Sequence, residues 1–434
     1  MRSLIFALLA SVVAASRYVV YFDQWHAASL PTRNATAGIT HVVTAFASST
    51  LFTTDPPGVY RPFMNLTQVR GLFAPGTKVC MAIGGWGDTA GFSAGAATEE
   101  TRKLYAKNVA ATVKRLGYDC VDVDWEYPGG NGEDYKQNPN SNKTSEIETY
   151  PLLLAEIKKA IKCKELSIAV PGREGDMIAF TAEQIPKISD AVDFVNLMTY
   201  DLMNRRDNAT THHTSIQGSL DTVNKYISLG MPASKMVLGF AFYAKWFMTA
   251  PGYICYAAVG CPTVLLEAAD GTDTGNSGAM TFETGNFAPL PSNLTETPDG
   301  TCGAGTAFKC KSADCCGQWG FCGTEVGHCG TGCQAGFGRC EGASTKESFK
   351  KALASAKYDS LAGGAWYWDS AFNIFWTWDT PAIMASKFDQ IVVPKGLGGV
   401  MAWSLGEDSL DWSHLYALQA GVKNLKGSDS DSGN

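Results

Sequence analysis

Three carboxylic acids stand at every second position of one short segment. Asp122, Asp124 and Glu126 alternate with Val123 and Trp125. Because side chains alternate across a strand, we expect the three carboxyls on one face, with neighbours about 7 Å apart. Three carboxyls in a partly dry interior cannot all ionise, because burial and like charge both favour keeping a proton. The outermost, Glu126, is therefore a candidate general acid at neutral pH.

Two other interpretations of this segment remain open: a solvated acidic face of a surface strand, and a calcium site. Val123 and Trp125 on the opposite face favour a strand that is buried on both sides. A calcium loop instead needs Gly and polar neighbours for its turn. We expect neither a metal nor a cofactor.

The segment belongs to a series of short apolar runs rich in β-branched residues, each followed by a stretch with helical periodicity. The runs are 18–22, 41–47, 78–85, 121–127, 166–171, 194–200, 236–243 and 399–405. Alternation of strands and helices predicts an α/β fold with a parallel sheet. Eight such strands are the number in a TIM (β/α)8 barrel.

The interval between the seventh and eighth runs is too long for one strand and helix unit. Residues 267–300 are rich in Gly, Thr, Asn and Pro, which is typical of a linker, so we expect a linker or insertion at 251–300, and a cluster of cysteines follows. Helical periodicity resumes near Ser348. We therefore expect a barrel formed by residues 17–250 and 344–426, a small disulfide-rich domain inserted at 301–341, and a polar tail at 427–434.

Eight of the 13 cysteines lie in the inserted segment. They are Cys302, Cys310, Cys315, Cys316, Cys322, Cys329, Cys333 and Cys340. About forty residues with little apolar content cannot form a core, so we expect disulfides to stabilise the domain. Eight cysteines allow 105 pairings, and spacing does not choose among them. A zinc module is the alternative, but the C-x-x-C pairs that it needs are absent.

For the other five cysteines, the sequence predicts the disulfide pairing only in part. Cys120 could pair with Cys80 or Cys163, and one of these three must stay free. Cys255 and Cys261 are expected to close a loop.

Charge and the N-terminal residues restrict the partners and the compartment. The 35 Lys and Arg and 42 Asp and Glu give a formal net charge of -7, so a nucleic-acid partner is not expected. Residues 1–16 resemble a signal peptide, and no later apolar run is long enough to cross a membrane. We expect a secreted, extracellular monomer. Glycosylation sequons stand at Asn34, Asn65, Asn142, Asn208 and Asn293.

The carboxylate segment also resembles a known family. Asp119-x-x-Asp122-x-Asp124-x-Glu126, followed by Tyr127, is similar to the signature of glycoside hydrolase family 18, the chitinase family with a TIM barrel. Six further segments resemble family motifs in the family's order: Tyr21-Phe22 with Trp25, Ala45–Ala47, Ala82–Trp86, Met198–Asp201, Gly239–Tyr243 and Gly398–Trp403.

The resemblance implies a substrate-assisted reaction. Glu126 would protonate the glycosidic oxygen while the sugar's own 2-acetamido carbonyl attacks the anomeric carbon. Asp124 would hold the acetamido N–H, Asp122 would tune the charge of Asp124, and Tyr200 would donate to the acetamido carbonyl. Asp119, which falls on the other face, would be structural. The substrate-binding residues implied by the family are Tyr21, Phe46, Gly85, Trp86, Tyr127, Met198, Asp201, Tyr243, Lys245 and Trp403.

Three positions depart from the family pattern. Ala82 stands where Ser is usual, Cys120 where Gly is usual, and Lys245 where Arg is frequent. Lys245 keeps the charge but loses the planar fork of Arg, so substrate contacts there would be weaker.

The inserted segment carries a second resemblance. Cys315-Cys316-Gly-Gln-Trp319-Gly-Phe321-Cys322 is similar to hevein-type chitin-binding domains. That family implies the pairs Cys302–Cys316, Cys310–Cys322, Cys315–Cys329 and Cys333–Cys340. It also implies a ligand surface on Trp319 and Phe321. His328 stands where a Tyr is usual and Gly317 where a Ser is usual, so hydrogen bonding to sugar would be reduced.

Together, these resemblances imply a secreted endo-acting chitinase that cleaves β-1,4 links between N-acetylglucosamine units with retention of configuration. Its partners would be chitin and chitooligosaccharides, held near the enzyme by the insert. A non-catalytic chitin lectin is the alternative from another class. An endo-N-acetylglucosaminidase acting on glycoproteins is the third.

Overall fold

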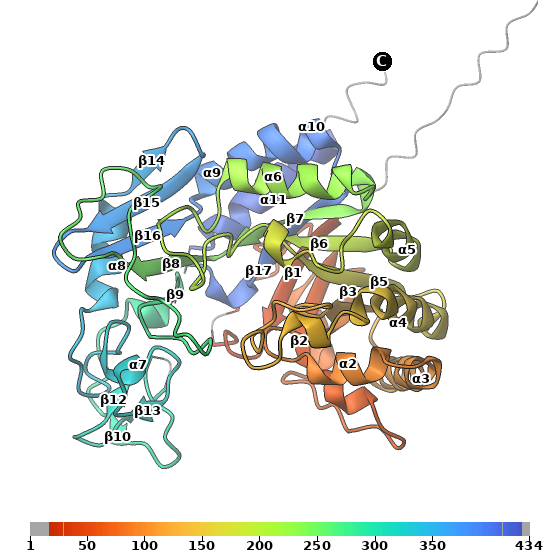
Figure 1. Cartoon of the computed structure of the whole chain (residues 1–434), viewed down its shortest axis with the longest axis horizontal. Coiled ribbons are helices and arrows are strands. Elements are labelled where there is room, and N and C mark those ends of the chain that lie inside the picture. Colours follow the sequence, from red (N-terminus) through yellow and green to blue (C-terminus); the bar gives the residue numbers. More distant parts are fainter. Residues whose placement is uncertain (1–16, 29, 305, 410, 428–434) are drawn as a thin grey trace, which may run out of the picture.

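The computed structural model describes residues 17–28, 30–304, 306–409 and 411–427, and its centre is a closed barrel (Figure 1). Eight parallel strands form it: β1 (Arg17–Asp23), β2 (His41–Ala47), β3 (Lys78–Gly84), β4 (Cys120–Asp124), β5 (Glu165–Pro171), β6 (Phe194–Met198), β7 (Met236–Ala241) and β17 (Gly399–Trp403). Their order around the barrel is β1-β17-β7-β6-β5-β4-β3-β2. The predicted TIM barrel is confirmed.

Helices cover the outside of the barrel, because their apolar faces pack on the strands. They are α1 (Leu66–Leu72), α2 (Ala90–Ala96), α3 (Glu99–Leu116), α4 (Glu146–Ile161), α5 (Gln184–Ala191), α6 (Ile216–Ser228), α9 (Pro381–Lys387), α10 (Val393–Lys395) and α11 (Ser413–Gly427). In α3, Tyr105, Val109 and Val113 are buried as their spacing predicts. A capping box at Thr98 begins this helix, and Gly117, at φ 84°, ends it.

The structure corrects the expected end of the carboxylate strand. β4 ends at Asp124 and not at Tyr127, so Glu126 lies in the loop that follows the strand. Cys120, Asp122 and Asp124 occupy alternate positions of β4, while Val121 and Val123 belong to the apolar layer under the helices. The general-acid candidate therefore lies at the mouth of the barrel, where TIM barrels place their active sites.

A second sheet interrupts the barrel between β7 and β17, and this corrects the expected domain boundaries. It is antiparallel, in the order β14-β15-β16-β8-β9. Its members are β8 (Tyr243–Met248), β9 (Ser277–Thr281), β14 (Lys357–Asp359), β15 (Gly364–Asp369) and β16 (Ile374–Trp378), and α8 (Thr345–Ala354) contacts β15 and β16. We name this sheet with α8, residues 243–293 and 342–378, the insertion lobe. Residues 243–250 and 344–378 were expected in the barrel, and β9 lies in the expected linker.

The cysteine-rich module, residues 294–341, adjoins the insertion lobe and lies apart from the barrel (Figure 1). It begins before the expected residue 301, because β10 (Thr295–Glu296) pairs with β11 (Phe308–Lys309). The other elements are the antiparallel β12 (Cys315–Cys316) and β13 (Cys322–Gly323), and α7 (Val326–Cys329). Its disulfides are Cys302–Cys316, Cys310–Cys322, Cys315–Cys329 and Cys333–Cys340, the set that the hevein resemblance implies.

Two further disulfides lie outside this module. Cys80 pairs with Cys120 inside the barrel, and Cys255 with Cys261 in a loop of the insertion lobe. Among the cysteines of the described residues, Cys163 has the free thiol, and it is exposed.

The described residues contain no helix that is both long enough and apolar enough to cross a bilayer. The expected signal peptide and residues 428–434 of the expected tail lie outside the described residues. All five sequon asparagines are exposed.

Candidate active site

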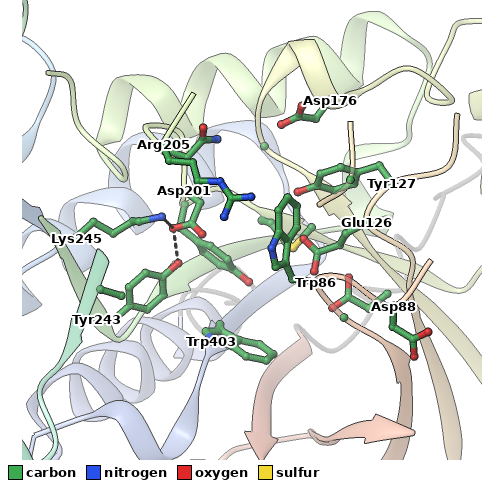
Figure 2. Close-up of a pocket in the computed structure, with 18 of the residues that line it drawn as sticks. Trp86, Asp88, Glu126, Tyr127, Asp176, Asp201, Arg205, Tyr243, Lys245 and Trp403 are labelled. Atoms are coloured by element: carbon green, nitrogen blue, oxygen red, sulfur yellow. Dashed lines mark hydrogen bonds and ion pairs between the residues drawn. The ribbon is translucent and has the colours of Figure 1, made fainter. Parts of the chain in front are cut away.

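A cleft of about 630 Å³ opens at the carboxyl ends of the barrel strands. Most of the sequence-predicted site residues line it: Phe46, Gly85, Trp86, Asp124, Glu126, Tyr127, Met198, Tyr200, Asp201, Tyr243, Lys245 and Trp403. Tyr21 and Asp122 do not line the cleft, because they are buried beneath it inside the barrel. Figure 2 shows Tyr243 and Lys245 on one side of the view and Glu126 and Tyr127 on the other, with Trp403 below.

Asp122 is held by three donors inside the barrel. The Tyr21 hydroxyl donates to its Oδ2 at 2.7 Å, and Ser167 and Asn196 Nδ2 donate to its Oδ1, the latter at 3.2 Å. Burial raises the pKa of Asp122, and these hydrogen bonds oppose that effect. Asp122 is thus fixed in one orientation beneath the cleft floor.

Asp124, the next inward residue of β4, is buried at the cleft floor. Its Oδ1 has no hydrogen-bond partner among the described residues. Burial raises the pKa of Asp124 well above its ordinary value, and the nearby charges of Glu126 and Asp122 raise it further. Because Asp124 lines the cleft, its carboxyl can accept a hydrogen bond from a ligand there.

Glu126 is only partly accessible, through the cleft, and packed protein surrounds the rest of its side chain. Burial raises its pKa to about 8. A hydrogen bond from Tyr127 lowers the pKa, whereas the negative charges of Asp201 and Asp176 raise it. At neutral pH Glu126 therefore carries a proton and can donate it into the cleft.

Aromatic rings form the floor beside these carboxyls. Trp403 stacks on Phe46, with ring centroids 5.6 Å apart and an interplanar angle of 19°, and its ring lies 5.4 Å from that of Tyr21. Gly85 makes this packing possible: its φ is +91°, and a Cβ there would lie 2.7 Å from the Phe46 ring. The flat indole face suits the C–H surface of a sugar ring.

Asp201 organises the opposite wall. Its Oδ1 accepts a hydrogen bond from the Tyr243 hydroxyl at 2.7 Å and lies 3.2 Å from Lys245 Nζ (Figure 2). Burial raises the pKa of Asp201, but the charge of Lys245 and the hydrogen bonds of His213 and Tyr243 hold it well below its ordinary value. Asp201 is thus a fixed negative charge. The Tyr200 ring packs edge-on against Tyr243, with centroids 6.1 Å apart.

Asp119 lies away from this site. Its carboxylate pairs with Arg70 at 2.8 Å and accepts the backbone N–H of Val79 at 2.9 Å. These bonds give it the structural role that its position on the other face implied.

Comparison with known proteins identifies the family. The model of glycosyl hydrolases family 18 matches residues 17–408. The chain belongs to this family. It is 25% identical over 354 residues to Chitinase 1 of Aphanocladium album. The match covers 77% of this chain and 63% of that relative. It is 32% identical over 191 residues to Endochitinase 1 of Metarhizium robertsii. That match covers 40% of this chain and 42% of the relative.

Solved structures of the family share the fold. A chitinase from Rhizomucor miehei superposes with a TM-score of 0.65 at 18% identity, over 93% of this chain and 99% of the other. At that identity the likeness concerns the fold alone.

Several cleft residues of this family 18 chain were missed by sequence reasoning. Asp176 pairs with Arg206 through two contacts of 2.9 and 2.7 Å. Glu267 of the insertion lobe accepts hydrogen bonds from Arg205 Nε, at 2.9 Å, and from the Tyr135 hydroxyl. Each of these carboxylates is separated from its partner by 30 to 132 residues in the sequence, and Glu267 lies in the segment that we expected to be a linker. The one local signal was the Arg205–Arg206 pair shortly after β6.

The three residues expected to bind chitin on the cysteine-rich module differ in exposure and in their position relative to the cleft. Trp319 and Phe321 have exposed fractions of 66% and 55%. Trp319 also lines the cleft, whereas Phe321 is not among the lining residues. His328 is partly buried and packs against Gly317 and Gly323.

Proposed function

We propose that the protein is a chitinase that hydrolyses β-1,4 links between N-acetylglucosamine units, with Glu126 as the general acid. One observation carries the proposal: Glu126, whose pKa burial raises to about 8, lines one cleft together with the Asp124 carboxyl and the Trp403 ring. The names of the relatives from Aphanocladium album and Metarhizium robertsii point to the same substrate.

The residues of the cleft support a substrate-assisted reaction. Glu126 donates its proton to the glycosidic oxygen, and the bond from that oxygen to the anomeric carbon breaks. The acetamido carbonyl oxygen of the same sugar attacks the anomeric carbon and forms an oxazolinium ion. Water then attacks this carbon from the side that the leaving sugar vacated, the bond from the acetamido oxygen to the carbon breaks, and the water gives its proton to the Glu126 carboxylate. The product keeps its configuration.

Asp124 and Tyr200 place the acetamido group for this attack. The Asp124 carboxyl, which lines the cleft, accepts the acetamido N–H, and once it is ionised its negative charge balances the positive charge that grows on the ring. The Tyr200 hydroxyl, at the cleft wall, donates to the acetamido oxygen. Asp122 is fixed by Tyr21, Ser167 and Asn196 and does not touch the sugar. Its role is to tune the charge of Asp124.

Glu126 also bears on the alternative of a non-catalytic chitin lectin. A binding protein has no need of a carboxyl whose pKa is raised to about 8 at the floor of its cleft. The intact Glu126 and Asp124 therefore favour hydrolysis over binding alone.

We further propose that the enzyme works outside the cell and binds polymer through the cysteine-rich module. The six disulfides of the described residues are typical of an oxidising compartment. The exposed Trp319 and Phe321 offer two flat apolar surfaces to sugar rings. Holding the polymer near the cleft would raise the local substrate concentration.

The deciding experiment is product analysis over time on N-acetylglucosamine hexamer, with anomers resolved by NMR. We expect shorter oligomers whose new reducing ends first appear as the β-anomer, and we expect Glu126→Gln to release none. Glu133→Gln is the matched control, because Glu133 is exposed on the same loop and does not line the cleft. Initial α-anomers, equal turnover by Glu126→Gln, or cleavage of the deacetylated hexamer at the same rate would contradict the proposal.

A further inference from the structure

The cysteine-rich module contributes an aromatic side chain to the cleft that contains Glu126. Trp319 belongs to the module by sequence and by its disulfides, yet it lines the same continuous cleft as Glu126 and Trp403. Next to it on the cleft wall are Ser277, Gly278 and Ala279 of β9. One surface thus runs from the barrel floor across the insertion lobe to the module.

The residue before Trp319 attaches the module to β9. Gln318 Nε2 donates to the backbone carbonyl of Ser277 at 3.1 Å. A Cβ on Gly278 would lie only 2.0 Å from Gln318 Oε1, so the absence of a side chain there allows this close approach. Gly332 of the module lies against the Trp246 ring of β8 in the same way, at 3.1 Å from its would-be Cβ. These contacts fix the backbone that carries Trp319.

Trp319 is nevertheless open to a ligand. Its exposed fraction is 66%, which is high for a Trp within packed protein. An exposed indole at a cleft wall offers a flat apolar face, and a pyranose ring presents a complementary C–H face. Phe321, two residues later, is exposed to a similar extent but lies outside the cleft lining.

We propose that Trp319 forms a distal sugar-binding subsite of the catalytic cleft. It stacks on a ring of the same β-1,4-linked chain that is cleaved at Glu126, at the part of the cleft bordered by β9. The module is then a part of the cleft and not only a separate anchor on the polymer. This inference rests on the proposed function for the identity of the sugar, and it assigns different roles to Trp319 and Phe321.

The test compares soluble N-acetylglucosamine oligomers from trimer to octamer. Affinities are measured by calorimetry in a Glu126→Gln background, so that binding is read without turnover. Oligomers long enough to reach Trp319 should bind about 3- to 10-fold more weakly after Trp319→Ala, whereas the trimer should bind equally well. In the enzyme with Glu126 intact, the same substitution should raise KM for the long oligomers only.

Three matched variants separate this role from a general effect. Lys309→Ala, an exposed change on β11 of the module, should leave oligomer affinities unchanged at every length, whereas Phe321→Ala should weaken binding to insoluble chitin. Gln318→Ala should reproduce the loss for long oligomers while keeping binding to insoluble chitin, because the hydrogen bond that positions the neighbouring Trp319 against β9 is then lost. Gln318 is thus a positioning residue.

The proposal is overturned if Trp319→Ala and Lys309→Ala give the same affinities at every oligomer length. It is also overturned if Trp319→Ala weakens the trimer as much as the octamer. Failure of the proposed function would look different, because the enzyme with Glu126 intact would then turn over no oligomer while the binding comparison would still report on Trp319.

Discussion

Asp122 and Asp124 lie two residues apart on the inward face of β4, but their surroundings are opposite. Asp122 accepts hydrogen bonds from Tyr21, Ser167 and Asn196, whereas Asp124 Oδ1 has no partner among the described residues. Asp122 is thus satisfied by the protein, whereas the Asp124 carboxyl lines the cleft. In the proposed mechanism, one strand supplies both a structural carboxyl and one that faces the sugar.

This difference predicts that the same Asp→Asn change at the two positions has different effects: at Asp122 it lowers the free energy of unfolding, and at Asp124 it lowers kcat. Asp122→Asn leaves at least one buried donor without an acceptor, so the free energy of unfolding should fall by about 1 to 3 kcal/mol. Asp124→Asn breaks no hydrogen bond at Oδ1, so stability should be unchanged or higher, while kcat should fall about 100-fold or more because the charge facing the oxazolinium ion is lost. Denaturant unfolding and hexamer hydrolysis measure the two effects. Equal loss of stability in both variants would contradict this division.

The pKa of Glu126 predicts the alkaline limit of activity. The acid acts only when it is protonated, so kcat/KM should fall as the pH rises through about 8. Asp201→Asn removes a negative charge that raises this pKa, so the fall should move to lower pH. Asp221→Asn, an exposed change on α6, should leave the profile where it is. The measurement is kcat/KM for a soluble oligomer between pH 5 and pH 10, and a shift of the Asp201→Asn profile to higher pH would contradict the assignment.

Local patterns predicted the barrel because its strands are buried on both faces. Such strands read as continuous apolar runs, and every run from 18–22 to 399–405 corresponds to a barrel strand. The insertion lobe was missed because its two groups of strands, β8-β9 and β14-β15-β16, form one sheet only through the distant pairing of β16 with β8. Phe375 of β16 pairs with Phe247 of β8, and the two residues belong to segments on either side of the cysteine-rich module. No local periodicity reports such a pair.

The site was predictable where one segment carries it and unpredictable where several segments meet. The period of two in β4 placed Asp122 and Asp124 on one face. Two partners of Asp122 come from β5 and β6, where Ser167 and Asn196 are single polar residues within these strands, and the third, Tyr21, comes from β1. That interruption was the available signal. The pairing of Cys80 with Cys120, left open by the sequence, follows from the register that places the two residues side by side on β3 and β4.

That disulfide is predicted to stabilise the barrel without taking part in the reaction. It lies on the inward face of β4, one step below Asp122, and closes a loop with a sequence separation of 40 residues. Loop-closure entropy for that length implies that replacing both Cys80 and Cys120 by Ala lowers the free energy of unfolding by about 4 kcal/mol. Cys163→Ser should change nothing, because that thiol is free and exposed. Denaturant midpoints of the three proteins, with hexamer turnover measured below the transition, provide the test. Equal midpoints would show that the disulfide contributes no stability, and loss of turnover in the folded double variant would show that it positions Asp122.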